Sequence, residues 1–481
     1  MSDATLETLN ARPLPAWYDA AKFGIFIHWG MWAIPAFAPK VGDIGEIFAT
    51  DYDRAITLSP YTEWYWNAIR TPGSPSAAFH RETFANAPYE AFRDPFLDGL
   101  KDWDPAAWAR SFRDAGARYV VLVTKHHDGF CLWPSEVANP RRRNWTSPRD
   151  IVGEVAAAVR AEGLKFGVYY SGGIDWTFNP EPLVTLADMM GSTPGGDYPD
   201  YAEAQVRELI ARYKPSLLWN DISWPTSEER LFKLFADYYE AVPDGVVNDR
   251  WVTPTDRSAA LRTREGRRKL DAVIKASIQA RAGERRGMIP PLVPHSDFRT
   301  PEYSAFDTVQ ATKWEATRGM SHSFGFNRND RPEDYAAAEE LIGGLIDGAA
   351  RNGGLLLNVG PRADGDIPDE QLRRLAAFGD WLERNGAAIY GARPWSRSDG
   401  ETVDRIPVRF TVTGDRLNLV FFGKIAGDQV VVRDLAIAGP AWTLGDHGDV
   451  RLARAGDDTV LTFANPPGDA FAPVVSAPLP D

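Results

Sequence analysis

The fold is decided by the stretch Ser216-Leu217-Leu218-Trp219-Asn220-Asp221-Ile222-Ser223-Trp224-Pro225, in which a short apolar run ends at a carboxylate. The run follows Pro215, which ends a helix expected over 200–213, and it predicts a buried strand. A carboxylate between two tryptophans at the carboxyl end of a strand is typical of the active site of a (β/α) barrel. The alternative is that Asp221 caps the helix that follows.

This strand is one unit of an alternating pattern. Further strands are expected at 23–30, 119–124, 164–170, 245–251, 298–303, 313–315 and 354–361. Helices are expected at 105–115, 149–162, 227–239, 332–348 and 369–385. Strand after strand ends in polar or aromatic residues, as in Lys125-His126-His127-Asp128. Strand–helix alternation predicts a parallel sheet, and polar residues gathered at one end of its strands indicate a barrel.

Three regions depart from this pattern. Residues 1–16 resemble a loose leader, and residues 31–100, rich in Pro, Gly and aromatics, are expected to form long loops. After Pro394 the helical signals end, and short β-like runs separated by Gly and Asp turns predict a small all-β domain. We therefore expect a (β/α) TIM-like barrel over residues 1–390, followed by a C-terminal β-sandwich over 391–481.

Composition narrows the classes of function. The chain has 481 residues, a net charge of −13 and 17 tryptophans. The negative charge argues against nucleic acid and anionic membranes as partners. The single Cys131 cannot form an internal disulfide, and neither a signal-peptide pattern nor an apolar run of 18 residues occurs, so a cytoplasmic location is expected. Tryptophans beside polar strand ends suit a site that stacks rings against the C–H faces of a sugar.

A basic segment interrupts the barrel pattern at 256–286, with ten Lys and Arg residues against four acidic ones. Four apolar residues occur there at helical spacing: Leu270, Val273, Ile274 and Ile278. Because the segment lies between two residues expected at the mouth of the barrel, we expect a helix beside that mouth. It would shape the leaving-group side of the site or make a subunit contact. The alternative is a flexible surface loop.

Four stretches together resemble the α-L-fucosidases of glycoside hydrolase family 29. They are Lys22-Phe23-Gly24-Ile25-Phe26-Ile27-His28-Trp29-Gly30, Thr124-Lys125-His126-His127-Asp128-Gly129-Phe130, Leu218-Trp219-Asn220-Asp221 and Asn352-Gly353-Gly354-Leu355-Leu356-Leu357-Asn358-Val359-Gly360-Pro361. The resemblance spans about 16–390 and implies hydrolysis of terminal α-L-fucosyl residues of glycans, without a cofactor. The sequence leaves the oligomeric state open, a homo-oligomer included.

The resemblance also implies a retaining mechanism, which needs two carboxyl groups about 5 Å apart. It assigns the nucleophile to Asp221. For the acid/base it favours Glu302, in Thr300-Pro301-Glu302-Tyr303, while Glu63, Glu265 and Glu315 remain candidates. Glu265 is most simply a surface residue, and Glu315 could bind substrate, support Glu302 or be structural.

The residues expected to contact the sugar follow from the same resemblance. Contacts to the hydroxyl groups and the ring are implied for His28, Glu63, Trp64, His126, His127, Tyr169, Trp219 and Arg250. An apolar niche for the 6-methyl group is implied for Phe26, Tyr61 and Phe324. A metal site at the His pair is not expected, because no third ligand lies at a usual spacing and Lys125 would repel a cation.

Two other functions stay open at this point. One is hydrolysis of a related sugar such as an α-L-galactoside, which depends on whether the niche admits a C6 hydroxyl. The other is a catalytically inactive fucose-binding protein, which would keep the aromatic residues and lack the carboxylates. The intact motif around Asp221 argues against the second.

Overall fold

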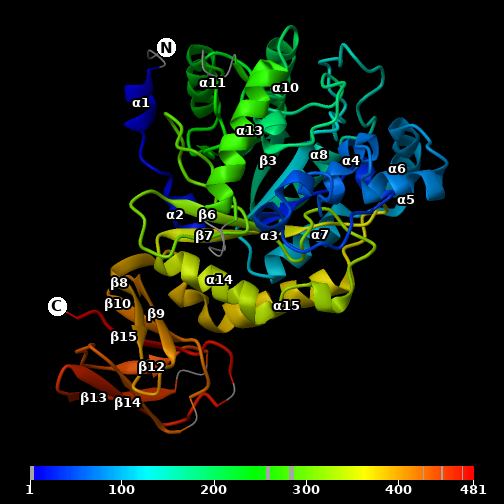
Figure 1. Ribbon diagram of the computed structural model, residues 1–481. Coiled ribbons are helices and arrows are strands. Elements are labelled where there is room, and N and C mark those ends of the chain that lie inside the picture. Colours follow the sequence, from blue (N-terminus) through cyan, green and yellow to red (C-terminus); the bar gives the residue numbers. More distant parts are fainter. Residues whose placement is uncertain are drawn as a thin grey trace.

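The computed structural model describes residues 5–255, 260–280, 287–425, 427–445, 448–468 and 470–480. It contains a parallel barrel sheet and an antiparallel C-terminal sheet, seen above and below one another in Figure 1. Helix α14 (Ala338–Ala350) lies between them, because it packs on β7 of the barrel and on β8 and β9 of the second sheet. The predicted fold class, a TIM-like barrel followed by a β-sandwich, is confirmed.

Seven parallel strands form the barrel sheet in the order β5-β4-β3-β2-β1-β7-β6. Their bounds are β1 Phe23–Ile27, β2 Tyr119–Lys125, β3 Lys165–Ser171, β4 Leu217–Asp221, β5 Val246–Val247, β6 Trp314–Gly319 and β7 Gly353–Val359. Strands β1, β2, β4 and β7 are buried along their whole length. Continuous burial follows from helices outside and packed side chains inside, and it explains why these strands are mostly apolar up to their last few residues.

An irregular segment, residues 297–303, closes the barrel between β5 and β6. Its first main-chain amide, from Asp297, donates to the carbonyl of Val247 on β5 at 2.9 Å. On its other side, Arg299 pairs with Trp314 and Glu302 with Thr317 of β6 in parallel bridges. The segment was expected as a strand, and it takes the place of one without forming a regular ladder.

Most predicted helices occur within a few residues of their expected bounds. They are α7 (Pro105–Asp114), α8 (Ile151–Ala161), α10 (Tyr198–Tyr213), α11 (Glu228–Ala241) and α15 (Asp369–Asn385). The helix expected from residue 332 begins only at Ala338, because Pro332–Asp334 forms a separate 3-10 turn. Within the described ranges, no helix is long and apolar enough to cross a membrane.

The expectation of long loops at 31–100 is wrong. This region folds into short helices and 3-10 turns, with α3 (Ile44–Thr50), α4 (Tyr65–Arg70), α5 (Pro75–Phe84) and α6 (Arg93–Gly99) as its helices. Caps define them: the side chain of Asp43 accepts from two amides of α3, and that of Ser74 accepts from the first turn of α5. Helices of six to ten residues are too short for an apolar period to stand out.

The expectation of a loose leader is also wrong for the residues that are described. A capping box at Thr5 and Thr8 starts α1 (Leu6–Asn10), and α2 (Ala16–Ala21) leads into β1. Between them, Arg12 donates to the carbonyls of Pro243 and Gly245, at 2.8 and 2.6 Å. These contacts tie the start of the chain to the outside of the barrel.

The basic segment contains a helix, α13 (Arg264–Gln279), as predicted. Ile274 and Ile278 pack against the barrel core, and Leu270 is half-buried. Val273 is 65% exposed, so its predicted place on the buried stripe is wrong. Residues four apart share a helix face, whereas Val273 is turned about 100° from Ile274. Residues 256–259 and 281–286 lie outside the described ranges.

The C-terminal sheet has eight antiparallel strands in the order β11-β14-β13-β12-β15-β10-β9-β8. They are β8 Arg393–Glu401, β9 Pro407–Thr413, β10 Arg416–Phe421, β11 Gln429–Val432, β12 Ala441–Thr443, β13 Asp449–Ala455, β14 Asp458–Phe463 and β15 Val474–Pro478. The sheet folds over its own apolar core, and Thr402, just after β8, pairs with Val432 of β11. We retain residues 390 and 391 as the proposed domain boundary, between α15 and β8.

Candidate active site

A pocket lies at the carboxyl ends of the barrel strands. Of the fifteen residues that the sequence analysis considered for the site, all but Glu265 and Glu315 line this pocket: Phe26, His28, Tyr61, Glu63, Trp64, His126, His127, Tyr169, Trp219, Asp221, Arg250, Glu302 and Phe324. Each of them is less than 9% exposed. The pocket thus brings together buried polar and aromatic side chains from the ends of β1 to β4, from the segments that follow β5 and β6, from the closing segment 297–303 and from residues 61–64.

Asp221 is the last residue of β4, and three groups hold its carboxylate. Tyr169 donates its hydroxyl to Oδ2 at 2.8 Å, and Arg250 donates to Oδ1 at 3.0 Å. The main-chain amide of Ile222 also donates to Oδ1, at 2.8 Å. Burial raises the pKa of Asp221, but the charge of Arg250 and these hydrogen bonds outweigh it, so the pKa lies below its usual value. Asp221 is therefore an ionised, positioned carboxylate.

Arg250 joins this carboxylate to a second one. One terminal nitrogen of its guanidinium donates to Asp221 and the other donates to Oε2 of Glu302 at 2.8 Å. Tyr61 donates its hydroxyl to the other oxygen of Glu302 at 3.2 Å. Burial raises the pKa of Glu302, and the charge of Asp221 adds to this rise while Arg250 opposes it. The two neighbouring carboxyl groups thus have pKa values shifted in opposite directions.

The residue after each carboxylate has a left-handed backbone. The φ angle is 68° at Ile222 and 46° at Tyr303. For a β-branched or bulky residue such a φ is rare and costs of order 1–3 kcal/mol, and it is found mostly at functional sites.

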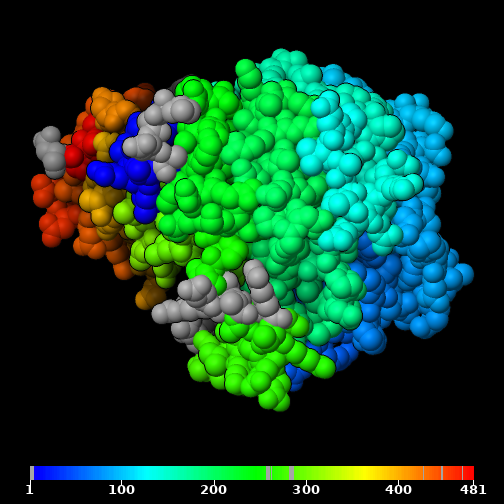
Figure 2. All heavy atoms as spheres, turned by 90° about the horizontal axis from the view of Figure 1, so that it is seen from above, coloured from blue at the N-terminus to red at the C-terminus, as the bar shows by residue number. Residues whose placement is uncertain are grey.

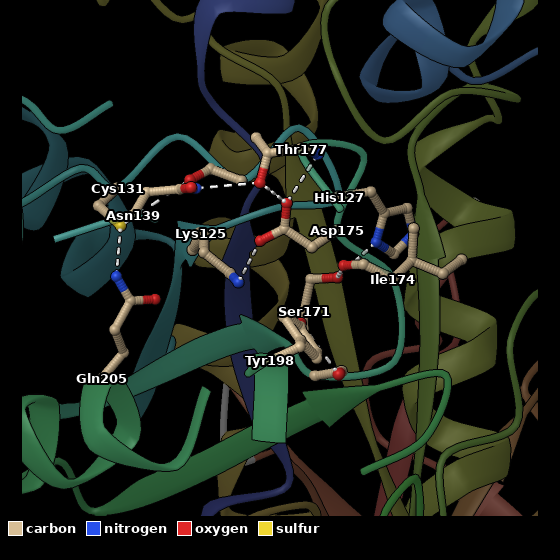
Figure 3. A network of polar contacts seen from close by, with 12 residues as sticks. Lys125, His127, Cys131, Asn139, Ser171, Ile174, Asp175, Thr177, Tyr198 and Gln205 are labelled. Carbon is tan, nitrogen blue, oxygen red and sulfur yellow. Dashed lines mark hydrogen bonds and ion pairs between the residues drawn. The ribbon is translucent and has the colours of Figure 1, made fainter. Parts of the chain in front are cut away.

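A buried polar network supports His127 (Figure 3). The hydroxyl of Ser171 donates to the carbonyl of Ile174, so Nδ1 of His127, 2.6 Å away, must donate to that hydroxyl. Nε2 then carries the lone pair, 3.8 Å from Asp221 Oδ2. Beside the histidine pair, Lys125 and Asp175 form a fully buried ion pair at 2.9 Å. Burial lowers the pKa of His127 to about 4, so the ring is a neutral hydrogen-bond acceptor.

His28, at the end of β1, is oriented in the same way. The side-chain amide of Asn358 donates to the carbonyl of Phe324 at 2.5 Å, which leaves its oxygen to accept from Nδ1 of His28 at 2.6 Å. Burial lowers the pKa of His28 to about 3. The pocket therefore presents two neutral imidazoles whose free Nε2 atoms can accept hydrogen bonds from hydroxyl groups.

Aromatic rings form one wall of the pocket. Tyr169 stacks on His126 with 5.4 Å between ring centroids, and on Trp219 with 5.5 Å. Trp64 meets His127 edge-on at 5.2 Å. Nδ1 of the buried His126 has no hydrogen-bond partner among the residues that the structure describes. A ligand with both C–H faces and hydroxyl groups would suit this wall.

The other candidate carboxylates have different environments. Glu63 lines the pocket and accepts from the amide of Gly325 at 2.9 Å, and burial raises its pKa to about 7. Glu315 lies away from the pocket, in the barrel core, where it accepts from the hydroxyls of Tyr18 and Tyr119. Its role as a substrate ligand is therefore not supported by its position. Glu265 is exposed on α13 and pairs with Lys269.

Several residues at the site were not predicted. Ser171 and Asn358 orient the histidines, and both could have been noticed as polar residues that end buried strands. Six apolar side chains also line the pocket, and no motif in the sequence indicates this role for them: Ile44, Phe48, Ile56, Leu186, Met189 and Met288. Among the described residues, no group of three or more His, Cys, Asp or Glu side chains is arranged to hold a metal ion.

Comparison with known proteins places this geometry in a family. The family description "Alpha-L-fucosidase" matches residues 1–387. An α-L-fucosidase of Dictyostelium discoideum is 33% identical over 407 residues, which cover 81% of this chain and 74% of that protein. A Thermotoga maritima α-fucosidase in complex with a mechanism-based inhibitor has a TM-score of 0.83 and 38% identity, covering 99% of this chain and 100% of that one. The same enzyme in complex with fucose has a TM-score of 0.82, 37% identity and the same coverage. The chain therefore belongs to the α-L-fucosidase family.

Proposed function

We propose that the protein is a retaining exo-α-L-fucosidase, with Asp221 as nucleophile and Glu302 as acid/base. The observation that carries the proposal is the guanidinium of Arg250, which donates to both buried carboxyl groups. One guanidinium that contacts both groups keeps them at the same place in the pocket, within reach of one glycosidic bond, and retaining enzymes place such a pair about 5–5.5 Å apart. Their opposite pKa shifts suit one ionised nucleophile and one protonated acid.

In the first step, an Asp221 oxygen forms a bond to the anomeric carbon of the fucosyl residue while the bond to the glycosidic oxygen breaks. The carboxyl proton of Glu302 passes to that oxygen, and the leaving group departs as an alcohol. Arg250 stabilises the carboxylate before attack. Its second contact, to Glu302, keeps a positive charge beside the carboxylate that forms when the proton leaves.

In the second step, the Glu302 carboxylate takes a proton from a water molecule, whose oxygen bonds to the anomeric carbon. The bond to Asp221 breaks, and fucose leaves with the α configuration because two inversions cancel. Glu302 is again protonated and Asp221 is again ionised. The pKa of Glu302, raised by burial and by the charge of Asp221, favours its protonated form at the start of each cycle.

The pocket wall supports a fucosyl residue as the sugar. The neutral His28 and His127 can accept from its hydroxyl groups, and the ring of Trp219 can cover a C–H face. Tyr61 and Phe324 contact each other, with 5.6 Å between ring centroids, and offer an apolar niche for a methyl group. A C6 hydroxyl, as in an α-L-galactoside, would lose its hydration against these rings.

Hydrolysis of 4-nitrophenyl α-L-fucoside and of the matching α-L-galactoside tests this function. We expect the fucoside to be cleaved at least tenfold faster in kcat/KM, with α-L-fucose seen first by proton NMR, before mutarotation. First release of the β anomer would contradict retention. Preference for the galactoside would contradict the sugar assignment. Binding of fucose without hydrolysis of the aryl fucoside would support an inactive binding protein instead.

A further inference from the structure

Two kinds of side chain line the pocket. The residues assigned to the sugar and to the chemical steps are mostly polar or aromatic, whereas six further residues form an apolar wall: Ile44, Phe48, Ile56, Leu186, Met189 and Met288. Within this wall Leu186, Met189 and Met288 are half-buried, and Ile44, Phe48 and Ile56 are buried. A terminal sugar held by the polar and aromatic residues would have its leaving group against this wall.

Met288 places the wall on the leaving-group side. Its main-chain amide donates to the carbonyl of Glu302 at 2.9 Å, and the amide of Glu302 donates back at 2.7 Å. This main-chain pair places Met288, which lines the pocket, next to Glu302, the proposed donor of a proton to the glycosidic oxygen of the departing alcohol. The main chains of residues 287 and 302 are in close contact, because a Cβ atom added to Gly287 would lie 2.0 Å from the carbonyl oxygen of Glu302.

Helix α13 holds the part of the wall that comes from α9 (Leu186–Met190). Its Arg267 pairs at 2.9 Å with Asp188, which lies on α9 between the two wall residues. The carbonyl of Leu261, just before α13, would lie 2.7 Å from a Cβ atom added to Gly191, so the two segments are in close contact.

The same helix also holds the part of the wall that comes from α3. Asp271 accepts from the hydroxyl of Tyr52 at 2.7 Å, and Lys275 pairs with Asp53 at 2.6 Å, both in the turn that follows α3. Figure 2 shows green surface that includes α13 projecting at one edge of the molecule, next to blue surface of the N-terminal region. Thus α13 joins the two sides of the wall.

We propose that the apolar wall is an aglycone site for leaving groups that present an apolar face, such as an aromatic ring, and that α13 holds it in shape. The inference rests on the proposed function and adds the chemical class of the leaving group. None of the six side chains has a hydrogen-bond donor, and their only acceptors are the weak thioether sulfurs of Met189 and Met288, so a leaving group with hydroxyls on every side gains little binding free energy from them. An aromatic ring gains binding free energy, because its own apolar surface and that of the wall are both buried from water.

Two inhibitors of one scaffold test the proposal without any chemical step. The first is a fucose-configured iminosugar, and the second is the same compound with a phenyl group on the carbon next to nitrogen. Isothermal titration gives the affinity gain due to phenyl, which we expect to be about tenfold or more in the unaltered protein. The first compound alone reports on the sugar pocket.

Each test variant has a matched control one residue away. Met189→Ser removes a wall side chain, whereas Met190→Ser changes a neighbour on α9 that is 53% exposed and outside the pocket lining. Ile274→Asp places a charge where α13 packs on the core, whereas Val273→Asp changes a residue that is 65% exposed. We expect the phenyl gain to fall below about threefold in the first variant of each pair and to persist in the second.

The outcomes separate this inference from the proposed function. If the bare iminosugar does not bind the unaltered protein, the proposed function is wrong and this inference with it. If it binds equally to all five proteins but the phenyl gain is absent, or is the same in all of them, only this inference is wrong. A change of oligomeric mass in Met189→Ser or Ile274→Asp with the phenyl gain intact would also overturn it, in favour of a subunit contact.

Discussion

The hydroxyl of Tyr169 donates to Oδ2 of Asp221 at 2.8 Å, across the boundary between β3 and β4. This hydrogen bond stabilises the ionised carboxylate and is one of the causes that lower its pKa. In Tyr169→Phe we expect the pKa of Asp221 to rise, so the acidic limb of the kcat/KM profile moves to higher pH. Tyr170→Phe is the control, because that hydroxyl donates to Gln205 instead. Equal shifts in both variants, or no shift in Tyr169→Phe, would contradict the role given to this bond.

Removal of the proposed nucleophile, Asp221, should abolish turnover and allow chemical rescue. For Asp221→Ala we expect kcat on an aryl α-L-fucoside to fall by at least about 10³-fold. Azide can enter the space left by the carboxylate and attack the anomeric carbon once, so the product should be the β-L-fucosyl azide. The product is identified by NMR. Azide product of the α configuration, or activity above a few per cent, would end the assignment.

Removal of the proposed acid/base, Glu302, should lower kcat/KM by a factor that depends on the leaving group. A phenol of low pKa departs without protonation, whereas a sugar alcohol does not. For Glu302→Ala we therefore expect a much larger loss of kcat/KM on a fucosyl disaccharide than on a dinitrophenyl fucoside. Azide should now give the α-L-fucosyl azide, because it replaces water in the second step. Glu63→Gln is the comparison: a leaving-group effect there, and none in Glu302→Ala, would move the assignment to Glu63.

The buried Glu315 should make stability depend on pH. Burial raises its pKa in the folded protein to about 7, from a usual value of 4.5. Its contribution is fully present below pH 4.5, where both states are protonated, and is lost as pH rises to 7, since only the unfolded state ionises at first. Glu315→Gln stays neutral, so its free energy of unfolding relative to the unaltered protein should rise by up to about 3 kcal/mol between pH 5 and pH 8.

Urea denaturation at the two pH values measures this change. The control is Glu265→Gln, whose side chain is 69% exposed and which should show no such trend. An unchanged difference between Glu315→Gln and the unaltered protein at pH 5 and pH 8 would show that Glu315 titrates normally.

The barrel and its inner pocket could be predicted because their signals are local. Strand β4 is a short apolar run that ends at Asp221, and the family motifs at His28, His126 and Asp221 occur at the ends of such runs. The carboxyl ends of parallel strands lie together in a barrel irrespective of the loop structure, so residues 330 apart in the sequence, such as His28 and Asn358, are hydrogen-bonded in the fold. This placement can therefore be predicted without knowledge of side-chain packing.

The closing segment and the apolar wall could not be predicted, because they depend on contacts between residues that are far apart in the sequence. In the closing segment 297–303, Asp249 accepts from the amide and the hydroxyl of Thr300, so a side chain replaces part of a strand ladder. The apolar wall comes from α3, α9 and Met288, which are far apart in the sequence. In the sequence Ile44 and Leu186 resemble ordinary core residues, and only the packing of the folded chain shows that they line the pocket.

The most direct test of the central claim is to trap the covalent intermediate. A 2-deoxy-2-fluoro-α-L-fucosyl fluoride slows both steps through its electron-withdrawing fluorine, while the fluoride leaving group still allows the first. Mass spectrometry after proteolysis then locates the sugar. We predict one fluorofucosyl group per chain, on the peptide that contains Asp221, and none in Asp221→Asn. A label on the peptide that carries Glu302 or Glu63, or release of the inverted sugar without any adduct, would contradict the account.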